Sequence, residues 1–188
     1  MRRRNVRLSI VGASSIDVLV PDANSVIGQW YERTPAAADG MPPHITLLWP
    51  WRPAPVTTED VEAVAAAVAG VRRFSLSFQR CGTFLGALYL VPEPDQVLYK
   101  LMRRLAACFP ETPPYGGEFT SPVPQMTVAK NDSQDALVEI RALLETQLAA
   151  RPLIVEVTEV CVSEAGLMDG ARWGVRSRIS LTEAPSRT

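Results

Sequence analysis

A proline-led tetrad that reads polar, apolar, threonine, apolar occurs once in each half of this chain. His44–Leu47 follows Pro43, and Gln125–Val128 follows Pro124. Alternate residues of a β-strand point to the same face, so each tetrad would turn its first residue and its threonine to one side and two apolar residues into a core. A chain that repeats such a unit is constrained to fold into two similar halves whose strands can meet across a cleft.

The segments around the two tetrads also repeat crudely. Apolar residues at helical spacing predict four helices, two around each tetrad, over residues 21–33, 58–70, 95–109 and 134–149. Apolar and alternating segments predict further strands at residues 7–14, 18–20, 74–78, 87–91, 153–162 and 171–181. Loops rich in proline and glycine, at residues 34–43 and 111–121, lead into the tetrads.

These elements predict an α+β fold. We expect residues 1–188 to form a single domain made of two lobes related by a pseudo-two-fold axis. Antiparallel sheets would line a central cleft, and the helices would pack outside them.

Composition narrows the classes of protein that this chain can belong to. A net charge of −1 and a pI near 5.9 provide no basic field that would attract duplex DNA or an anionic membrane. The apolar runs are shorter than the roughly 18 residues that a membrane span needs. The cysteines, Cys81, Cys108 and Cys161, are odd in number and lack metal-ligand spacing, which favours reduced thiols. We therefore expect a cytoplasmic monomer without a signal peptide, metal or cofactor.

The polar residues of the tetrads point to phosphoryl chemistry. With an imidazole and a hydroxyl on each side of a cleft, the hydroxyls can donate to phosphate oxygens while one imidazole activates water and the other protonates the leaving alkoxide, without a metal. His44 is the only histidine in the chain, and Gln125 occupies the equivalent position in the second tetrad. A glutamine amide donates and accepts hydrogen bonds but does not exchange a proton near neutral pH.

The two tetrads resemble the motifs of the two-histidine phosphoesterase superfamily, and in particular its 2′-5′ RNA ligase and cyclic phosphodiesterase group. Residues 43–51 match the first motif and its tail, and residues 124–130 match the second except at Gln125. The resemblance extends over nearly the whole chain, through Trp30, residues 84–94, residues 109–117 and Trp173. It implies hydrolysis of a 2′,3′-cyclic or 2′-5′-linked phosphodiester on RNA ends or small nucleotides.

The resemblance also assigns roles to residues. It implies that His44 is one of two proton carriers, that Thr46 and Thr127 hold phosphate, and that Gln125 stands where the second histidine belongs. Three further residues are candidates for substrate binding, with Lys130 on phosphate and Tyr115 and Trp173 stacked on a base. The competing interpretation is that both aromatic residues serve packing, and that Lys130, at an odd offset from Thr127, faces elsewhere.

Three functions therefore remain open. The chain is a slowed phosphodiesterase with His44 as its single proton carrier, or a non-catalytic module that binds a nucleotide or phosphate. In the third, the cleft takes a different small molecule, with His44 and Gln125 as a polar pair in an apolar pocket. Arg52 is the only cation close to the first motif, and phosphate sites usually carry more positive charge. The glutamine is also compatible with an introduced substitution that silences a natural enzyme.

Overall fold

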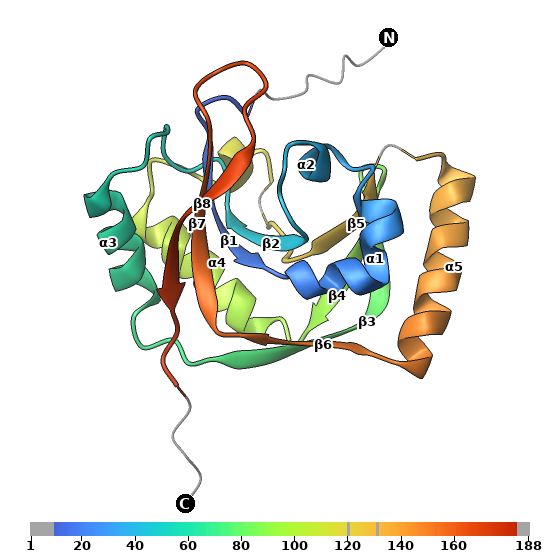
Figure 1. Cartoon of the computed structure of the whole chain (residues 1–188). Helices are drawn as coiled ribbons and strands as arrows, with labels where there is room; N and C mark the ends of the chain where they lie inside the picture. Colours follow the sequence, from blue (N-terminus) through green and yellow to red (C-terminus); the bar gives the residue numbers. More distant parts are fainter. Residues whose placement is uncertain (1–9, 120, 131, 184–188) are drawn as a thin grey trace, which may run out of the picture.

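The fold is built on one curled antiparallel sheet. The computed structural model describes residues 10–119, 121–130 and 132–183. Among these residues eight strands pair in the order β6-β3-β4-β5-β2-β1-β7-β8 (Figure 1). The strands are β1 Ser14–Leu19, β2 His44–Leu48, β3 Phe74–Phe84, β4 Ala87–Glu93, β5 Met126–Lys130, β6 Leu153–Val157, β7 Glu159–Ala165 and β8 Trp173–Ser180. The predicted α+β class with antiparallel strands is confirmed.

Helices pack on the sheet in a way that joins the two halves. They are η1 Pro21–Ala23, α1 Asn24–Tyr31, α2 Pro35–Ala38, α3 Thr58–Val68, α4 Gln96–Cys108, η2 Pro114–Gly117 and α5 Gln134–Ala150. Helix α1 packs against β5, and α4 packs against β2, so each half covers the central strand of the other. Helix α5 lies along β3, and α3 lies against α4 at the opposite side of the molecule (Figure 1). The two halves thus exchange helices across the sheet.

Local sequence explains where the helices begin. The Thr57 hydroxyl accepts a hydrogen bond from the Asp60 amide at 3.1 Å, and the Asp60 carboxylate accepts from the Thr57 amide at 3.1 Å. This capping box satisfies two amides that would otherwise lack partners at the start of α3. At the start of α5 the Ser133 hydroxyl accepts a hydrogen bond from the amide of Ala136, without a reciprocal bond.

Several predicted elements differ from those observed. The strand predicted at residues 7–14 begins only at Ser14, because Gly12 adopts a left-handed φ of 69° in a turn; residues 7–9 lie outside the described part. The loop at residues 34–43 contains the short helix α2. The strand predicted at 153–162 divides at Thr158, since β6 pairs with β3 whereas β7 pairs with β1. An apolar pattern shows that a segment is extended, but it does not show which neighbour the segment pairs with.

Candidate functional site

The two tetrads meet at the centre of the sheet. Strands β2 and β5 are antiparallel, and their ladder has the single pair Ile45 and Met126, both fully buried. Continuing this register by one residue places His44 opposite Thr127 and Thr46 opposite Gln125. We call the side of the sheet that carries these four residues the tetrad face.

The register also sets the spacing between the four polar residues. Directly opposed residues of antiparallel strands lie about 5 Å apart, and diagonal ones about 7–8 Å. His44 and Gln125 lie on one diagonal, and Thr46 and Thr127 lie on the other. All four are half-buried. The two hydroxyls thus lie across one diagonal, and the imidazole and the amide lie across the other.

A β-bulge follows each threonine. In β2 the partners of Asp17 and Ile16 are Thr46 and Leu48, so Leu47 is an extra residue. Bulges of this kind re-aim side chains and are frequent next to active sites. Because of this bulge, the consecutive residues Leu47 and Leu48 both lie in the core, and each is 1% exposed.

The equivalent bulge in β5 decides the position of Lys130. The partners of Tyr89, Leu88 and Ala87 in β4 are Thr127, Ala129 and Lys130, so Val128 is the extra residue. Because Tyr89 and Ala87 share a face of β4, Lys130 lies on the same face as Thr127. The odd spacing between Thr127 and Lys130 would turn Lys130 to the other face of a regular strand, but the bulge restores it to the face of Thr127. Lys130 is exposed and lies about 10 Å along the strand from Thr127.

The imidazole of His44 is held by the backbone that precedes it. Its Nδ1 lies 2.8 Å from the carbonyl oxygen of Pro42, and the Tyr31 hydroxyl lies 3.4 Å from the same nitrogen. The Tyr31 hydroxyl also makes contacts of 2.9 and 2.8 Å with the carbonyl oxygens of Met41 and Pro42. A carbonyl only accepts, so Nδ1 carries a hydrogen, and Nε2 is left as the nitrogen that can take up or release a proton.

A carboxyl group that the sequence analysis did not select lies beside this site. Asp17 is 0% exposed, opposite Thr46 on β2 and opposite Cys161 on β7. The Ser15 hydroxyl donates to its Oδ2 at 2.6 Å. Burial raises the pKa of Asp17, against the opposing effects of the charge of His44 and of nearby hydroxyl groups.

Tyr115 reaches the site from the loop before β5. Its amide donates to the carbonyl oxygen of Trp49 at 2.6 Å, and its phenol interacts with the Thr46 side chain. Burial, followed by the negative charge of Asp17, raises the pKa of Tyr115 to about 12, so the phenol stays protonated. Its ring makes edge contacts with Trp49 at 6.2 Å and Phe119 at 5.6 Å between centroids. Tyr115 therefore combines a packed ring with a hydroxyl at the candidate site.

Two other residues considered from the sequence lie apart from the tetrads. Trp173 is on β8, three strands and so about 14 Å along the sheet from β2. Its amide donates to the carbonyl oxygen of Asp39 at 2.8 Å, and its side chain is half-buried. Arg52 forms ion pairs with Asp60 at 3.4 Å and Glu111 at 2.8 Å. The structure thus groups Tyr115 with the tetrads, while Trp173 lies on an edge strand and Arg52 is paired.

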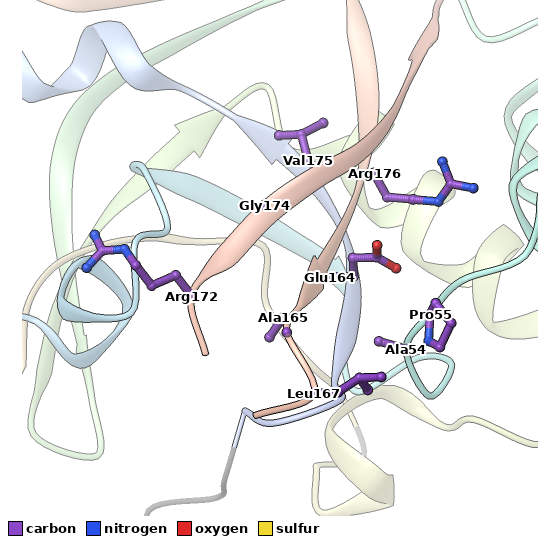
Figure 2. A pocket seen from close by; sticks show the side chains of 10 residues that line it. Ala54, Pro55, Glu164, Ala165, Leu167, Arg172, Gly174, Val175 and Arg176 are labelled. Atoms are coloured by element: carbon purple, nitrogen blue, oxygen red, sulfur yellow. The ribbon is translucent and has the colours of Figure 1, made fainter. Parts of the chain in front are cut away.

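A hollow of about 360 Å³ lies between the β7–β8 hairpin and residues 54–55 (Figure 2). None of the four tetrad residues lines it. Arg172 and Arg176 extend in opposite directions in Figure 2. The Glu164 carboxylate accepts from the Val56 amide at 2.9 Å, and the Arg176 Nε donates to the Val56 carbonyl at 3.3 Å. These two hydrogen bonds fasten the loop to the hairpin.

The burial of Asp17 predicts how the free energy of unfolding depends on pH. A carboxyl whose folded-state pKa is raised supports folding below its unfolded pKa of about 3.9, and this support is lost as the pH rises through the folded-state value. We expect Asp17→Asn to increase the free energy of unfolding by about 1 kcal/mol or more at neutral pH, and by much less near pH 4. Urea denaturation at both pH values measures the difference, and an equal effect at both would contradict it.

The environments of the three cysteines predict how fast each thiol reacts. Burial and then Glu145 raise the pKa of Cys81 to about 11, and burial and then Glu159 raise that of Cys161 to about 12, whereas Cys108 is exposed. Because the thiolate is the nucleophile, we expect one thiol to react rapidly with Ellman's reagent in the folded protein and all three after denaturation. The Cys108→Ser variant should show no rapid phase; a second rapid thiol in the original chain would contradict the burial of the other two.

Comparisons with known proteins agree with this fold. The model of the 2′-5′ RNA ligase superfamily matches residues 19–166. The fold is similar to that of E. coli LigT in complex with NADP+, with a TM-score of 0.58 at 19% identity over 93% of this chain and 99% of LigT. It is also similar to TT0787 of Thermus thermophilus, with a TM-score of 0.59 at 16% identity over 90% of this chain and 97% of that one. No curated protein matches the sequence.

The curled antiparallel sheet with its two central tetrads defines a protein of the two-histidine phosphoesterase fold. The chain belongs to the 2′-5′ RNA ligase superfamily. Within the described residues no helix is long and apolar enough to cross a membrane. Asp17 and Tyr31 are the polar residues near His44 that the sequence analysis missed. For Asp17 the signal was present, since Ser15 and Asp17 alternate with apolar residues in β1.

Proposed function

We propose that the tetrad face binds the phosphodiester group of a small nucleotide or an RNA end and hydrolyses 2′,3′-cyclic or 2′-5′ linkages slowly and without a metal. Thr46 and Thr127 donate to the phosphate, and His44 exchanges a proton with the attacking or leaving oxygen. Gln125 provides a hydrogen bond in place of the second proton carrier. The protein acts as a cytoplasmic monomer.

The observation that carries this proposal is the arrangement around the pair of Ile45 and Met126. It opposes the imidazole and the amide on one diagonal and the two hydroxyls on the other. The hydrogen bond to Pro42 leaves the Nε2 of His44 for chemistry. LigT, whose fold is similar, is known in complexes with 3′-AMP, ATP and NADP+, which supports a small nucleotide as the ligand here.

Turnover of 2′,3′-cyclic nucleotides and 2′-5′ oligonucleotides in the presence of EDTA tests the proposal. We expect slow hydrolysis that EDTA does not change and that His44→Ala lowers by about 10² or more, because a positioned acid or base contributes roughly 10²–10⁴ in rate. Thermal unfolding verifies that the variant is folded. Unchanged turnover in His44→Ala would remove His44 from the mechanism.

A binding module is the second candidate, and the specific observation that favours it is Gln125. Without a second group that exchanges protons, either the attacking water or the leaving alkoxide is left unassisted. Nucleotide binding without turnover, in the original chain and after Gln125→His, would support this alternative. If neither protein binds a nucleotide, the remaining interpretation is a different small molecule, held by His44 and Gln125 beside the rings of Tyr115 and Trp49.

A further inference from the structure

Asp17 is a fully buried carboxyl group placed directly beside a phosphate-binding hydroxyl. In β1, Ile16 and Val18 point into the core, whereas Ser15 and Asp17 point to the tetrad face. Asp17 is the cross-strand partner of Thr46. A charged carboxylate in this place would be separated from a bound phosphodiester by little more than one side chain.

Burial favours the neutral form of Asp17, whereas the hydroxyl groups around it favour the ionised form. Ser15 donates to Oδ2 at 2.6 Å, and the hydroxyls of Ser163 and Thr46 are close enough to stabilise negative charge. In the described part of the chain, however, Oδ1 and the Ser163 Oγ are buried without a well-formed hydrogen bond. An ionised carboxylate with an unsatisfied oxygen is costly in a buried site, so burial dominates and raises the pKa of Asp17.

The hydroxyl of Thr46 has one hydrogen and two lone pairs to distribute. The Tyr115 phenol, whose pKa is raised to about 12, stays protonated and is close enough to the Thr46 side chain to donate to one lone pair. If Asp17 is neutral, its O–H can donate to the second lone pair from the directly opposed position on β1, and the Thr46 hydrogen is then free to point at a ligand. If Asp17 is ionised, it accepts the Thr46 hydrogen, and Thr46 then presents a lone pair to the ligand. A lone pair repels a phosphate oxygen, so the two states differ in affinity.

We propose that Asp17 is a positioning residue that, as the neutral acid, directs the hydroxyl hydrogen of Thr46 toward a bound phosphodiester. The proposal rests on the proposed function for the identity of the ligand. No covalent bond changes: Asp17 keeps its proton while it donates, and ionisation releases that proton to solvent and reverses the hydrogen bond. The titratable groups that interact with Asp17 are His44 on β2, Tyr31 on α1, Tyr115 before β5 and Cys161 on β7.

Binding of 2′,3′-cyclic AMP as a function of pH tests this role. The ligand's phosphodiester does not titrate near neutral pH, and a His44→Gln background removes the imidazole titration and suppresses turnover. By calorimetry at pH values below and above the Asp17 midpoint measured by NMR, we expect the affinity of the His44→Gln protein to fall about tenfold as Asp17 ionises. Adding Asp17→Asn should abolish this fall, because an amide does not titrate and can keep donating to Thr46. Adding Asp22→Asn, the same change at an exposed position, should leave the fall in place.

A flat profile in the His44→Gln protein, or an equal fall after Asp17→Asn, would overturn the proposal. A ligand-free measurement covers the case in which the double variant does not fold. The carboxyl carbon of Asp17 is followed by NMR in the full chain and in its Thr46→Val variant. We expect a midpoint above the ordinary value of about 3.9 in the full chain and a further rise in the variant, because the ionised form loses a donor.

An unchanged midpoint in Thr46→Val would overturn the coupling between Asp17 and Thr46. The two measurements also separate this inference from the proposed function. If no variant binds the cyclic nucleotide while Thr46→Val shifts the Asp17 midpoint, the phosphodiester function fails and the coupling between the two side chains stands.

Discussion

Replacing Gln125 by histidine is expected to raise metal-independent hydrolysis of 2′,3′-cyclic nucleotides by about 10² or more. The new imidazole would occupy the diagonal position opposite His44. There it can exchange a proton with whichever of the attacking and leaving oxygens His44 does not reach. Attacking and leaving oxygens lie on opposite sides of phosphorus in an in-line displacement, so one imidazole cannot assist both. A gain of about 10² corresponds to about 2.7 kcal/mol of transition-state stabilisation, the lower end of what a positioned acid or base contributes.

The leaving group shows which proton transfer the new histidine restores. Alkoxides leave poorly without an acid, whereas a nitrophenolate leaves readily as the anion. We expect Gln125→His to accelerate a cyclic nucleotide more than a nitrophenyl nucleotide ester, as an added acid would. Gln147→His, the same change on the exposed side of α5, should leave both rates unchanged. A folded Gln125→His protein with no gain on either substrate would contradict a disabled phosphodiesterase.

Much of the fold could be predicted because it depends on patterns that are local in the sequence. The capping box at Thr57 and the apolar stripe of residues 58–70 defined α3 without tertiary information. The division of residues 153–162 between β6 and β7 could not be predicted in this way. Thr158 separates two extended segments of similar character, and the partner of each is set by strands far away in the chain.

The candidate site shows the same limit. The tetrads placed His44, Thr46, Gln125 and Thr127 on one face because strand alternation is a short-range property. The face of the strand on which Lys130 lies depends on the bulge at Val128. That bulge can be recognised only from the pairing of β5 with β4. A bulge reverses the parity of every later residue in the strand, so spacing alone gave no firm answer for Lys130.

Removing both threonine hydroxyls is expected to cause the largest loss of ligand affinity. Thr46→Val and Thr127→Val preserve side-chain shape while each deletes one donor to the phosphate. A hydrogen bond to a charged group contributes about 1.5–3 kcal/mol, so the double variant should bind 3′-AMP about 10²–10⁴ times more weakly in calorimetry. Thr146→Val, an exposed change on α5, should bind as the original chain does.

The two single variants should differ in ligand affinity and in the free energy of unfolding. Thr46 shares its hydroxyl with Asp17 and Tyr115, whereas the cross-strand partner of Thr127 on β4 is Tyr89. Thr46→Val therefore leaves a buried carboxyl and a phenol without a common partner, in addition to removing a phosphate donor. We expect it to lower both ligand affinity and the free energy of unfolding more than Thr127→Val does. If a folded double variant binds 3′-AMP as tightly as the unsubstituted protein, the phosphate binds elsewhere. If the two single variants lose equal affinity and equal stability, Thr46 is not coupled to Asp17 and Tyr115.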